Sequence, residues 1–239
     1  MDKNKIKLFM FDYDGTLRDS MNPNVKGAKP QAFAESIVEF HPELSDKKED
    51  IKKIYLETSG LNRFIQLREV EKRLSDFDIY PIKEKNWSER FNHHVKEEEI
   101  PLFEDVNETI IELKERGYLV AVGSSVPQKY LEKILNYHSH LSVRFDLILG
   151  NQKWHKGESE VSNFIKGVPY IAYACGKFDL KPKQIAYVGD AKEDISHGNE
   201  AGVYTIGKYD ERIPKTKTIL EAEKPNLLIK DLSEILKLF

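Results

Sequence analysis

Four short segments of this chain have the pattern of β-strands that are buried on both faces. Each is a nearly uninterrupted run of apolar residues, and the last three end in glycine; the segments are residues 6–11, 118–123, 145–150 and 184–189. Shorter strands are expected at 203–206 and 226–229, and helical patterns occur at 106–116, 127–137, 169–178 and 193–201. Strands that alternate with helices predict an α/β fold with a doubly wound parallel sheet.

Residues 18–99 follow a different pattern. Apolar residues recur there every three or four positions, as in the stripe of Ile51, Ile54 and Tyr55, and no segment has a convincing strand pattern. Helices are expected at 31–40, 47–58, 63–74 and 83–96. We therefore predict a Rossmann-like α/β core formed by residues 1–17 and 100–239, into which an all-helical domain, residues 18–99, is inserted.

The composition gives no sign of a nucleic-acid or membrane partner. The 239 residues are 40% hydrophobic and 32% charged, with a formal net charge of -3. No apolar run approaches the roughly 18 residues of a membrane span, and the run near the N-terminus is too short for a secretory signal. The single cysteine suits a reducing compartment. We expect a soluble cytoplasmic protein, either a monomer or a homodimer.

Two carboxylates, Asp12 and Asp14, come directly after the first apolar run. Side chains two positions apart on a strand point the same way, so both acids are expected to face one small volume. Gly15 allows a sharp turn and Thr16 adds a hydroxyl, which suits a phosphate site. Asp-Gly is also a common turn sequence, so a plain strand end is an alternative. A calcium loop is disfavoured, because its glycine belongs at the sixth position and Gly15 is the fourth.

Two further acids, Asp190 and Asp194, follow the strand predicted at 184–189. Capping of the next helix would explain them, because carboxylates are favoured at helix N-termini. In a parallel sheet, however, they would also converge on the edge that carries Asp12 and Asp14. Four carboxylates in one place repel each other unless a cation lies among them. A magnesium ion, which prefers oxygen ligands, fits this arrangement.

With these residues in order, the chain resembles the haloacid dehalogenase superfamily of phosphohydrolases. Residues 12–16 match its first motif, Asp-x-Asp-Gly-Thr, and Ser124 after the second apolar strand matches the second. Asp190 and Asp194 match the fourth motif, Gly-Asp-x-x-x-Asp. The third motif is a lysine, for which Lys166 in a Lys-x-x-Pro setting is the stronger candidate and Lys156 the competitor. The resemblance is to capped members, in the group of phosphoglycolate phosphatases and β-phosphoglucomutases, and implies that the helical insertion is the cap.

The resemblance also implies a role for each motif residue. Asp12 would be the nucleophile that forms an aspartyl phosphate, and Asp14 would protonate the leaving group and then activate water. Ser124 and Lys166 would hold the phosphoryl oxygens. Mg²⁺ would be bound by Asp12, the backbone carbonyl of Asp14, and Asp190. Asp194 would complete or orient the metal shell.

The predicted function is therefore that of a magnesium-dependent phosphatase acting on a small phosphorylated metabolite. A sugar phosphomutase and a non-catalytic binding or regulatory relative are the alternatives, whereas dehalogenase chemistry would not need Asp14. Specificity is expected to lie in the cap. Arg18 and Arg63 are candidates to contact the leaving group, and either one is equally explained as a solvated surface arginine.

Overall fold

The computed structural model describes residues 3–58, 63–74, 84–138, 144–156 and 160–239. Within these ranges the chain divides into two compact units. The first unit contains Met1–Arg18, Leu102–Glu211 and Thr216–Phe239, and the second contains Asp19–Pro101 and Arg212–Lys215. Each unit has its own hydrophobic core, and each is described separately below.

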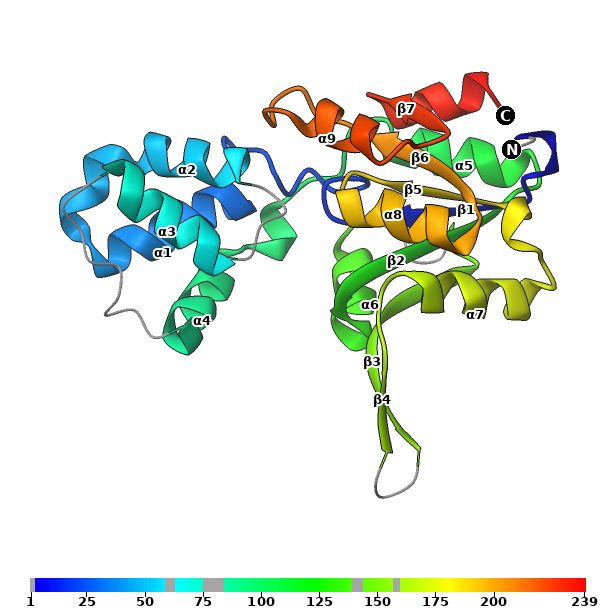
Figure 1. Cartoon of the computed structure of the whole chain (residues 1–239), viewed down its shortest axis with the longest axis horizontal. Coiled ribbons are helices and arrows are strands. Elements are labelled where there is room, and N and C mark those ends of the chain that lie inside the picture. Colours follow the sequence, from blue (N-terminus) through cyan, green and yellow to red (C-terminus); the bar gives the residue numbers. More distant parts are fainter. Residues whose placement is uncertain (1–2, 59–62, 75–83, 139–143, 157–159) are drawn as a thin grey trace. The chain divides into compact units, whose positions relative to one another are not determined.

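The first unit is built on a mainly parallel sheet, and this confirms the predicted α/β fold. In the described residues the strand order is β4-β3-β2-β1-β5-β6-β7, and every neighbouring pair is parallel except β3 and β4 (Figure 1). The strands are β1 (Leu8–Asp12), β2 (Leu119–Pro127), β3 (Leu147–Lys156), β4 (Glu160–Phe164), β5 (Ile185–Gly189), β6 (Tyr204–Lys208) and β7 (Leu227–Ile229). The central strand, β1, therefore lies between β2 and β5.

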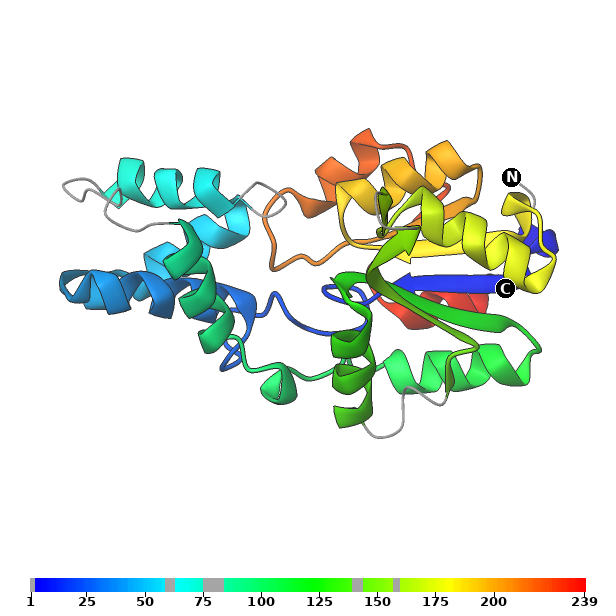
Figure 2. The same cartoon turned by 90° about the horizontal axis from the view of Figure 1, so that it is seen from below.

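Helices cover both faces of this sheet, as Figures 1 and 2 show. Phe9 and Phe11 of β1 belong to the core on one face, and Leu8 and Met10 to the core on the other. This alternation follows from the pleat of a strand, so a strand buried on both faces needs apolar residues throughout. The helices are α5 (Val106–Glu115), α6 (Gln128–Tyr137), α7 (Val168–Phe178), α8 (Lys192–Ala201) and α9 (Thr216–Ala222), with short 3-10 turns η1 (Lys3–Lys5), η5 (Pro182–Gln184) and η6 (Leu232–Lys237).

Two strands are longer than the sequence pattern predicts. The sheet continues beyond Gly123 in β2 as far as Pro127, with an irregular register after Gly123. Strand β3 continues beyond Gly150 and turns back through β4 as an antiparallel hairpin, which projects from the sheet in Figure 1. This hairpin accounts for the long connection before Lys166. The sequence analysis missed it because residues 151–156 are mostly polar and lack the apolar pattern of a buried strand.

In the described residues of the second unit, the regular elements are all helices joined by turns and loops, as expected for the insertion. Its elements are α1 (Lys29–Phe40), η2 (Pro42–Lys47), α2 (Lys48–Glu57), α3 (Arg63–Leu74), α4 (Glu84–His94) and η3 (Glu97–Glu99). Phe33 and Trp87 meet edge to face in its core, with ring centroids 5.6 Å apart. Ile213, from the segment after β6, packs into the same core. The backbone N–H of Asp19 donates to the carbonyl of Pro101 at 2.9 Å, so the two ends of the insertion meet.

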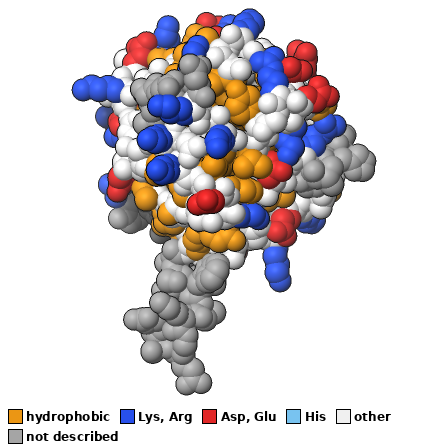
Figure 3. Space-filling view, turned by 90° about the vertical axis from the view of Figure 1, so that its right-hand side faces the viewer, with side chains coloured by type: hydrophobic (Ala, Val, Ile, Leu, Met, Phe, Trp, Pro, Cys, Tyr) orange, Lys and Arg blue, Asp and Glu red, His pale blue; other side chains and the backbone are white. Residues whose placement is uncertain are grey.

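The edge of the sheet at which β1 and β5 begin is rich in lysine. A cavity of about 550 Å³ there is lined by Lys5, Ile6, Lys7, Lys181, Lys183 and Gln184. Figure 3 shows the side of the molecule that lies on the right in Figure 1, where lysine and arginine side chains (blue) group among hydrophobic ones. Among the described residues, no helix is both long enough and apolar enough to cross a membrane.

Candidate active site

Three of the predicted acids converge at the carboxyl edge of the sheet. Asp12 is the last residue of β1, Asp190 comes directly after β5, and Asp194 lies in the first turn of α8. Carboxylate oxygens of these three residues lie within 4.8 Å of one another. Strands β1 and β5 are neighbours in the sheet. Asp12 and Asp190 therefore lie side by side at the strand ends, although they are 178 positions apart in the sequence.

Lys166 is the cation among these acids. Its Nζ lies 2.6 Å from Asp12 Oδ1 and 2.6 Å from Asp194 Oδ1. Its position just before α7 is secured by β3, because its backbone N–H donates to Asn151 Oδ1 at 3.0 Å. Tyr170 of α7 donates to the same oxygen at 2.9 Å. The side chain of the competitor, Lys156, lies outside the described part of the structure.

Asp194 both caps α8 and faces the acid cluster. Its Oδ2 accepts a hydrogen bond from the backbone N–H of Ala191 at 3.2 Å, which satisfies a donor at the helix start. The hydroxyl of Tyr187 donates to its other oxygen at 3.4 Å. The capping interpretation and the site interpretation of this residue are therefore compatible. The same carboxyl group serves the helix through one oxygen and Lys166 through the other.

The loop after β1 fits tightly against Asp190. Gly15 has a φ of +82°, and a Cβ at this position would lie 2.1 Å from Asp190 Oδ2. Thr16 donates through Oγ1 to Asp190 Oδ1 at 3.0 Å. Glycine is therefore required here both for its backbone conformation and for its lack of a side chain. These contacts position the Asp190 carboxyl group toward the other acids.

Lys208, at the end of β6, is a site residue to which the sequence analysis gave no role. It is only 3% exposed, its Nζ donates to the carbonyl of Gly15 at 3.3 Å, and it lies 3.5 Å from the centroid of the Phe103 ring. The signal for it was its position, because a charged residue at the carboxyl end of a parallel strand lies at the edge where the other site residues gather. Lys208 holds the Gly15 loop and brings a second positive charge near Asp190.

The acids are held in an environment that disfavours their charge. Burial raises the pKa of Asp12 well above its ordinary value; Lys166 opposes this shift, and Asp194 and Asp190 add to it. Burial also raises the pKa of Asp190 to about 6, and the charge of Asp194 adds to the effect. For Lys166, burial disfavours the ammonium, but Asp12 and Asp194 outweigh that and raise its pKa well above the ordinary value.

A divalent cation fits this cluster. The ammonium of Lys166 contacts Asp12 and Asp194, and Lys208 brings a second positive charge near Asp190, so two cations face three acids and their charge is only partly balanced. Their donor atoms are all oxygen, which is the ligand type that Mg²⁺ and other hard divalent cations prefer. The geometry and the donor set are consistent with a divalent metal site formed by Asp12, Asp190 and Asp194.

Asp14 lies apart from the three clustered carboxylates and is paired with Arg18. Arg18 donates through Nε to Asp14 Oδ1 at 2.9 Å, and its Nη2 contacts the same oxygen. Arg18 is fully buried, so the interpretation of it as a solvated surface arginine is wrong. The side chain of Arg63, the other arginine considered, lies outside the described part of the structure.

Ser124 lies at the same edge of the sheet, on β2. Asp12 and Gly123 are partners in the register of β1 and β2, which places Ser124 one residue beyond the nucleophile candidate. Its Oγ accepts a hydrogen bond from the backbone N–H of Val126 at 3.4 Å, and its carbonyl accepts one from Tyr170 at 3.2 Å. The strand does not end at Gly123 as expected, yet the hydroxyl still reaches the carboxyl edge of the sheet.

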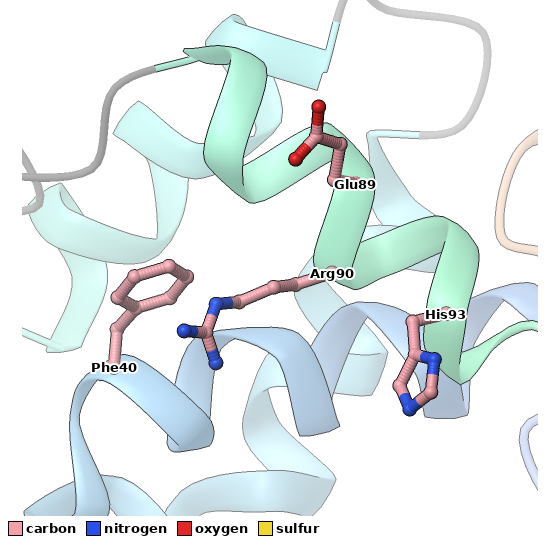
Figure 4. A pocket seen from close by; sticks show the side chains of 4 residues that line it. All are labelled: Phe40, Glu89, Arg90 and His93. Atoms are coloured by element: carbon pink, nitrogen blue, oxygen red, sulfur yellow. The ribbon is translucent and has the colours of Figure 1, made fainter.

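The helical unit has a hollow of its own, shown in Figure 4. It has a volume of about 340 Å³ and is lined by Phe40, Glu89, Arg90 and His93. The Arg90 guanidinium lies over the Phe40 ring, 4.6 Å from its centroid, and is paired with Glu39. Glu89 points away from this pair in Figure 4. The polar groups do not converge on one point, so the carboxylate cluster of the first unit is the stronger candidate for chemistry.

Comparison with known proteins identifies the family. The model of the haloacid dehalogenase-like hydrolases matches residues 9–208, which include every acid of the site. The chain belongs to the haloacid dehalogenase-like hydrolases. It is 30% identical to a phosphoglycolate phosphatase of Pasteurella multocida over 244 aligned positions, covering 97% of each protein. It is 26% identical to a pyrophosphatase of Bacillus cereus, covering 97% of this chain and 95% of the relative.

Solved structures agree with this assignment. A predicted phosphoglycolate phosphatase from Haemophilus somnus has 25% identity and a TM-score of 0.65, with 98% of each chain covered. A putative β-phosphoglucomutase from Thermotoga maritima has a TM-score of 0.66 at 18% identity, with 97% of this chain and 99% of the other covered, and shares the fold. The family match and the similar phosphatases together make this haloacid dehalogenase-like hydrolase a phosphatase.

Proposed function

We propose that this phosphatase depends on Mg²⁺ and hydrolyses a small phosphorylated metabolite through a covalent aspartyl phosphate on Asp12. The observation that carries the proposal is the cluster of Asp12, Asp190 and Asp194, in which the ammonium of Lys166 contacts Asp12 and Asp194. A carboxylate can attack phosphorus only if it is ionised. Burial raises the pKa of Asp12, and the ammonium of Lys166 opposes that shift, as a bound divalent cation would.

Asp12 and Lys166 act together in the first step. One oxygen of Asp12 attacks phosphorus while the ester P–O bond breaks, which leaves the phosphoryl group on Asp12. Lys166 is within 2.6 Å of that carboxylate, so its ammonium also meets the phosphoryl oxygens as negative charge builds up on them. Ser124 offers a hydroxyl from the neighbouring strand to the same group.

The metal is held by the acids that this fold brings together. Asp12, Asp190 and Asp194 provide carboxylate oxygens, and the backbone carbonyl of Asp14 is the further ligand implied by the family resemblance. When bound, Mg²⁺ neutralises charge on the transferring phosphoryl group. Thr16 and Gly15 fix the orientation of Asp190, and Ala191 and Tyr187 fix that of Asp194.

Asp14 moves the protons. Its carboxyl group gives a proton to the leaving oxygen as the P–O bond breaks, and the resulting carboxylate takes a proton from the water that attacks the aspartyl phosphate. The alcohol and inorganic phosphate are the products, and Asp12 and Asp14 return to their starting states. Asp14 suits this role because it follows Asp12 by two residues and its side chain remains 17% exposed.

The family resemblance gives the helical insertion the role of a cap. We assign residues 1–17 and 100–239 to the catalytic core and residues 18–99 to the cap, and we expect substrate specificity to lie in the cap. Phosphoglycolate is the first substrate to test, because a relative at 30% identity over nearly its whole length is a phosphoglycolate phosphatase. Inorganic pyrophosphate is the second, on the strength of the relative from Bacillus cereus.

The proposal is tested by measuring phosphate release from phosphoglycolate, pyrophosphate and a hexose phosphate, with Mg²⁺ and with EDTA. Asp12→Asn is expected to lower turnover by roughly 10³-fold or more, since it removes the nucleophile. Asp46→Asn, at an exposed position of the second unit, is the matched control and keeps full activity. Full turnover of Asp12→Asn or in EDTA contradicts the mechanism. Isomerisation of the hexose phosphate without phosphate release indicates a phosphomutase instead.

A further inference from the structure

Arg18 is a buried charge to which the proposed mechanism gives no role. It is 0% exposed, and an arginine that loses its hydration needs partners that compensate for the loss. Arginine side chains rarely lie fully inside a protein, and when they do they are usually paired with an acid. The partner here is Asp14, the residue that the proposed function assigns to proton transfer.

The backbone holds Arg18 beside Asp14. The N–H groups of Leu17 and Arg18 both donate to the carbonyl of Tyr13 at 2.9 Å, and the N–H of Gly15 donates to the carbonyl of Arg18 at 2.8 Å. Arg18 also forms a β-bridge with Leu102 on its other side. These hydrogen bonds close the loop and fix the position of the Arg18 backbone, from which its side chain extends.

The guanidinium is fixed as well. It lies over the ring of the fully buried Tyr13, 4.9 Å from the ring centroid. Two of its nitrogens, Nε and Nη2, are directed at one oxygen of Asp14, Oδ1. Two donors on one oxygen, from a planar group stacked on an aromatic ring, fix the position of Asp14 Oδ1. A single acid on a short loop would not otherwise have one orientation.

The two acids of the first motif therefore have separate cations. Lys166 contacts Asp12, and Arg18 contacts Asp14. We propose that Arg18 is a positioning residue, which orients the Asp14 carboxyl group toward the leaving oxygen and so determines how well the enzyme cleaves esters with poor leaving groups. This inference rests on the proposed function of Asp14. It concerns leaving-group chemistry and leaves attack by Asp12 unchanged.

The test compares two phosphate esters. An alkyl ester, β-glycerophosphate, needs a proton on its leaving oxygen, whereas the aryl ester p-nitrophenyl phosphate releases a stable phenolate without one. The value of kcat/KM reports steps up to the first phosphoryl transfer, so it isolates the acid role of Asp14. Arg18→Met is expected to lower kcat/KM for the alkyl ester by roughly 10²-fold, the lower range for proton transfer. The aryl ester is expected to retain its kcat/KM.

Three further variants make the result decisive. Asp14→Asn is expected to show the same selective loss. Arg18→Lys keeps the buried positive charge and is therefore expected to fold and to recover part of the alkyl ester rate. The recovery is expected to be incomplete, because an ammonium cannot reproduce the planar fork. Arg116→Met is the matched control, because Arg116 pairs with Glu112 at the same i, i+4 spacing on the surface, and its rates are expected to equal those of the wild type.

Each outcome supports or overturns the inference. Equal losses for both esters in Arg18→Lys, or an unchanged alkyl ester rate in a folded Arg18→Met protein, overturn it and leave Arg18 as a structural ion pair. If Arg18→Met does not fold, the ratio of the two rates in Arg18→Lys decides. If the wild-type protein hydrolyses neither ester with Mg²⁺ present, the proposed function fails, which is a different result from loss of selectivity.

Discussion

Gly15 shows how a single residue without a side chain can shape this site. Its φ of +82° is unfavourable for other residues, and a Cβ would lie 2.1 Å from Asp190 Oδ2. Gly15→Ala should therefore displace the Asp190 carboxyl group or the loop that follows β1. Because small misplacements in an active site are costly, we expect turnover to fall by about 10²-fold or more. Phosphate release at saturating substrate and Mg²⁺ measures the effect.

The control for this variant is Gly117→Ala. Gly117 has nearly the same φ, +85°, but no atom lies within 4 Å of the position that its Cβ would take. Gly117→Ala is expected to lower the free energy of unfolding by about 1–2 kcal/mol through backbone strain, with full activity. The difference between the two variants isolates the contact with Asp190. Equal turnover in both would contradict the importance of that contact.

The buried charged residues of this protein differ in how well the sequence predicts their role. Lys166 is recognisable from its Lys-x-x-Pro setting, and the structure places it 2.6 Å from Asp12. The role of Lys208 depends on its contact with Gly15, which is 193 positions away in the sequence. For Arg18, the sequence left open a contact with the leaving group and a solvated surface position, and the structure shows that it is fully buried. Local sequence describes a residue type, whereas burial depends on what packs over it.

At the scale of elements, α8 packs unusually close to β6. Gly198 of α8 has no room for a side chain, because its Cβ would lie 2.5 Å from Thr205 Cγ2. Gly176 of α7, by contrast, has nothing within 4 Å of that position. Since α8 begins two residues after Asp190 and carries Asp194, its distance from the sheet affects where both acids lie.

These two glycines give opposite predictions. Replacement of a helical glycine by alanine normally raises stability, so Gly176→Ala is expected to increase the free energy of unfolding by about 0.4–1 kcal/mol. Gly198→Ala is expected to decrease it by about 1–3 kcal/mol, because overpacking forces α8 away from β6. Denaturant titrations of both variants provide the comparison. Stabilisation by both substitutions would contradict the close approach of α8 to the sheet.

The helices of the insertion, in which apolar residues recur at helical spacing, were predicted well from the sequence. The β3–β4 hairpin was not predicted. Helix α3 begins and ends at the predicted residues, and α1, α2 and α4 lie within about two residues of their predicted ranges. The stripe of apolar residues on each of these helices indicates which face of the helix is buried. The outer part of β3 pairs only with β4, so its residues carry no signal of burial on both faces.

At the scale of the whole molecule, the two units have separate hydrophobic cores. The cores on the two faces of the sheet contain only residues of the first unit, and the core around Phe33 contains only residues of the second. The two ends of the insertion are joined by the hydrogen bond between Asp19 and Pro101. A short linker can therefore replace the insertion without stretching the first unit.

We predict that a protein in which a short Gly-Ser linker replaces residues 20–100 still folds. Ile213→Ser is included, because Ile213 loses its core partners in this protein. Circular dichroism and thermal unfolding are expected to show a cooperative α/β protein that hydrolyses p-nitrophenyl phosphate but has lost selective hydrolysis of its physiological substrate. The full chain with Ile213→Ser alone is the control. An unfolded deletion protein would contradict the independence of the first unit.

The sequence by itself determined the class of fold, the helical nature of the insertion and the family. These depend on local periodicity and on the motif residues from Asp12 to Asp194, which follow one another in order along the chain. Strand patterns also placed the acids at the carboxyl edge of the sheet, because parallel strands all end on the same side.

Only the tertiary structure decided which charges meet. The sequence could not show that Arg18 pairs with Asp14, that Lys208 holds the Gly15 loop, or that β3 extends into a hairpin. The contact of Lys208 with Gly15 depends on strand order, which brings together residues 193 positions apart. The pairing of Arg18 with Asp14 and the β3–β4 hairpin are local in sequence, but the apolar pattern does not indicate them. The periodicity of an element reports which of its faces are buried, and it does not report which partner buries them.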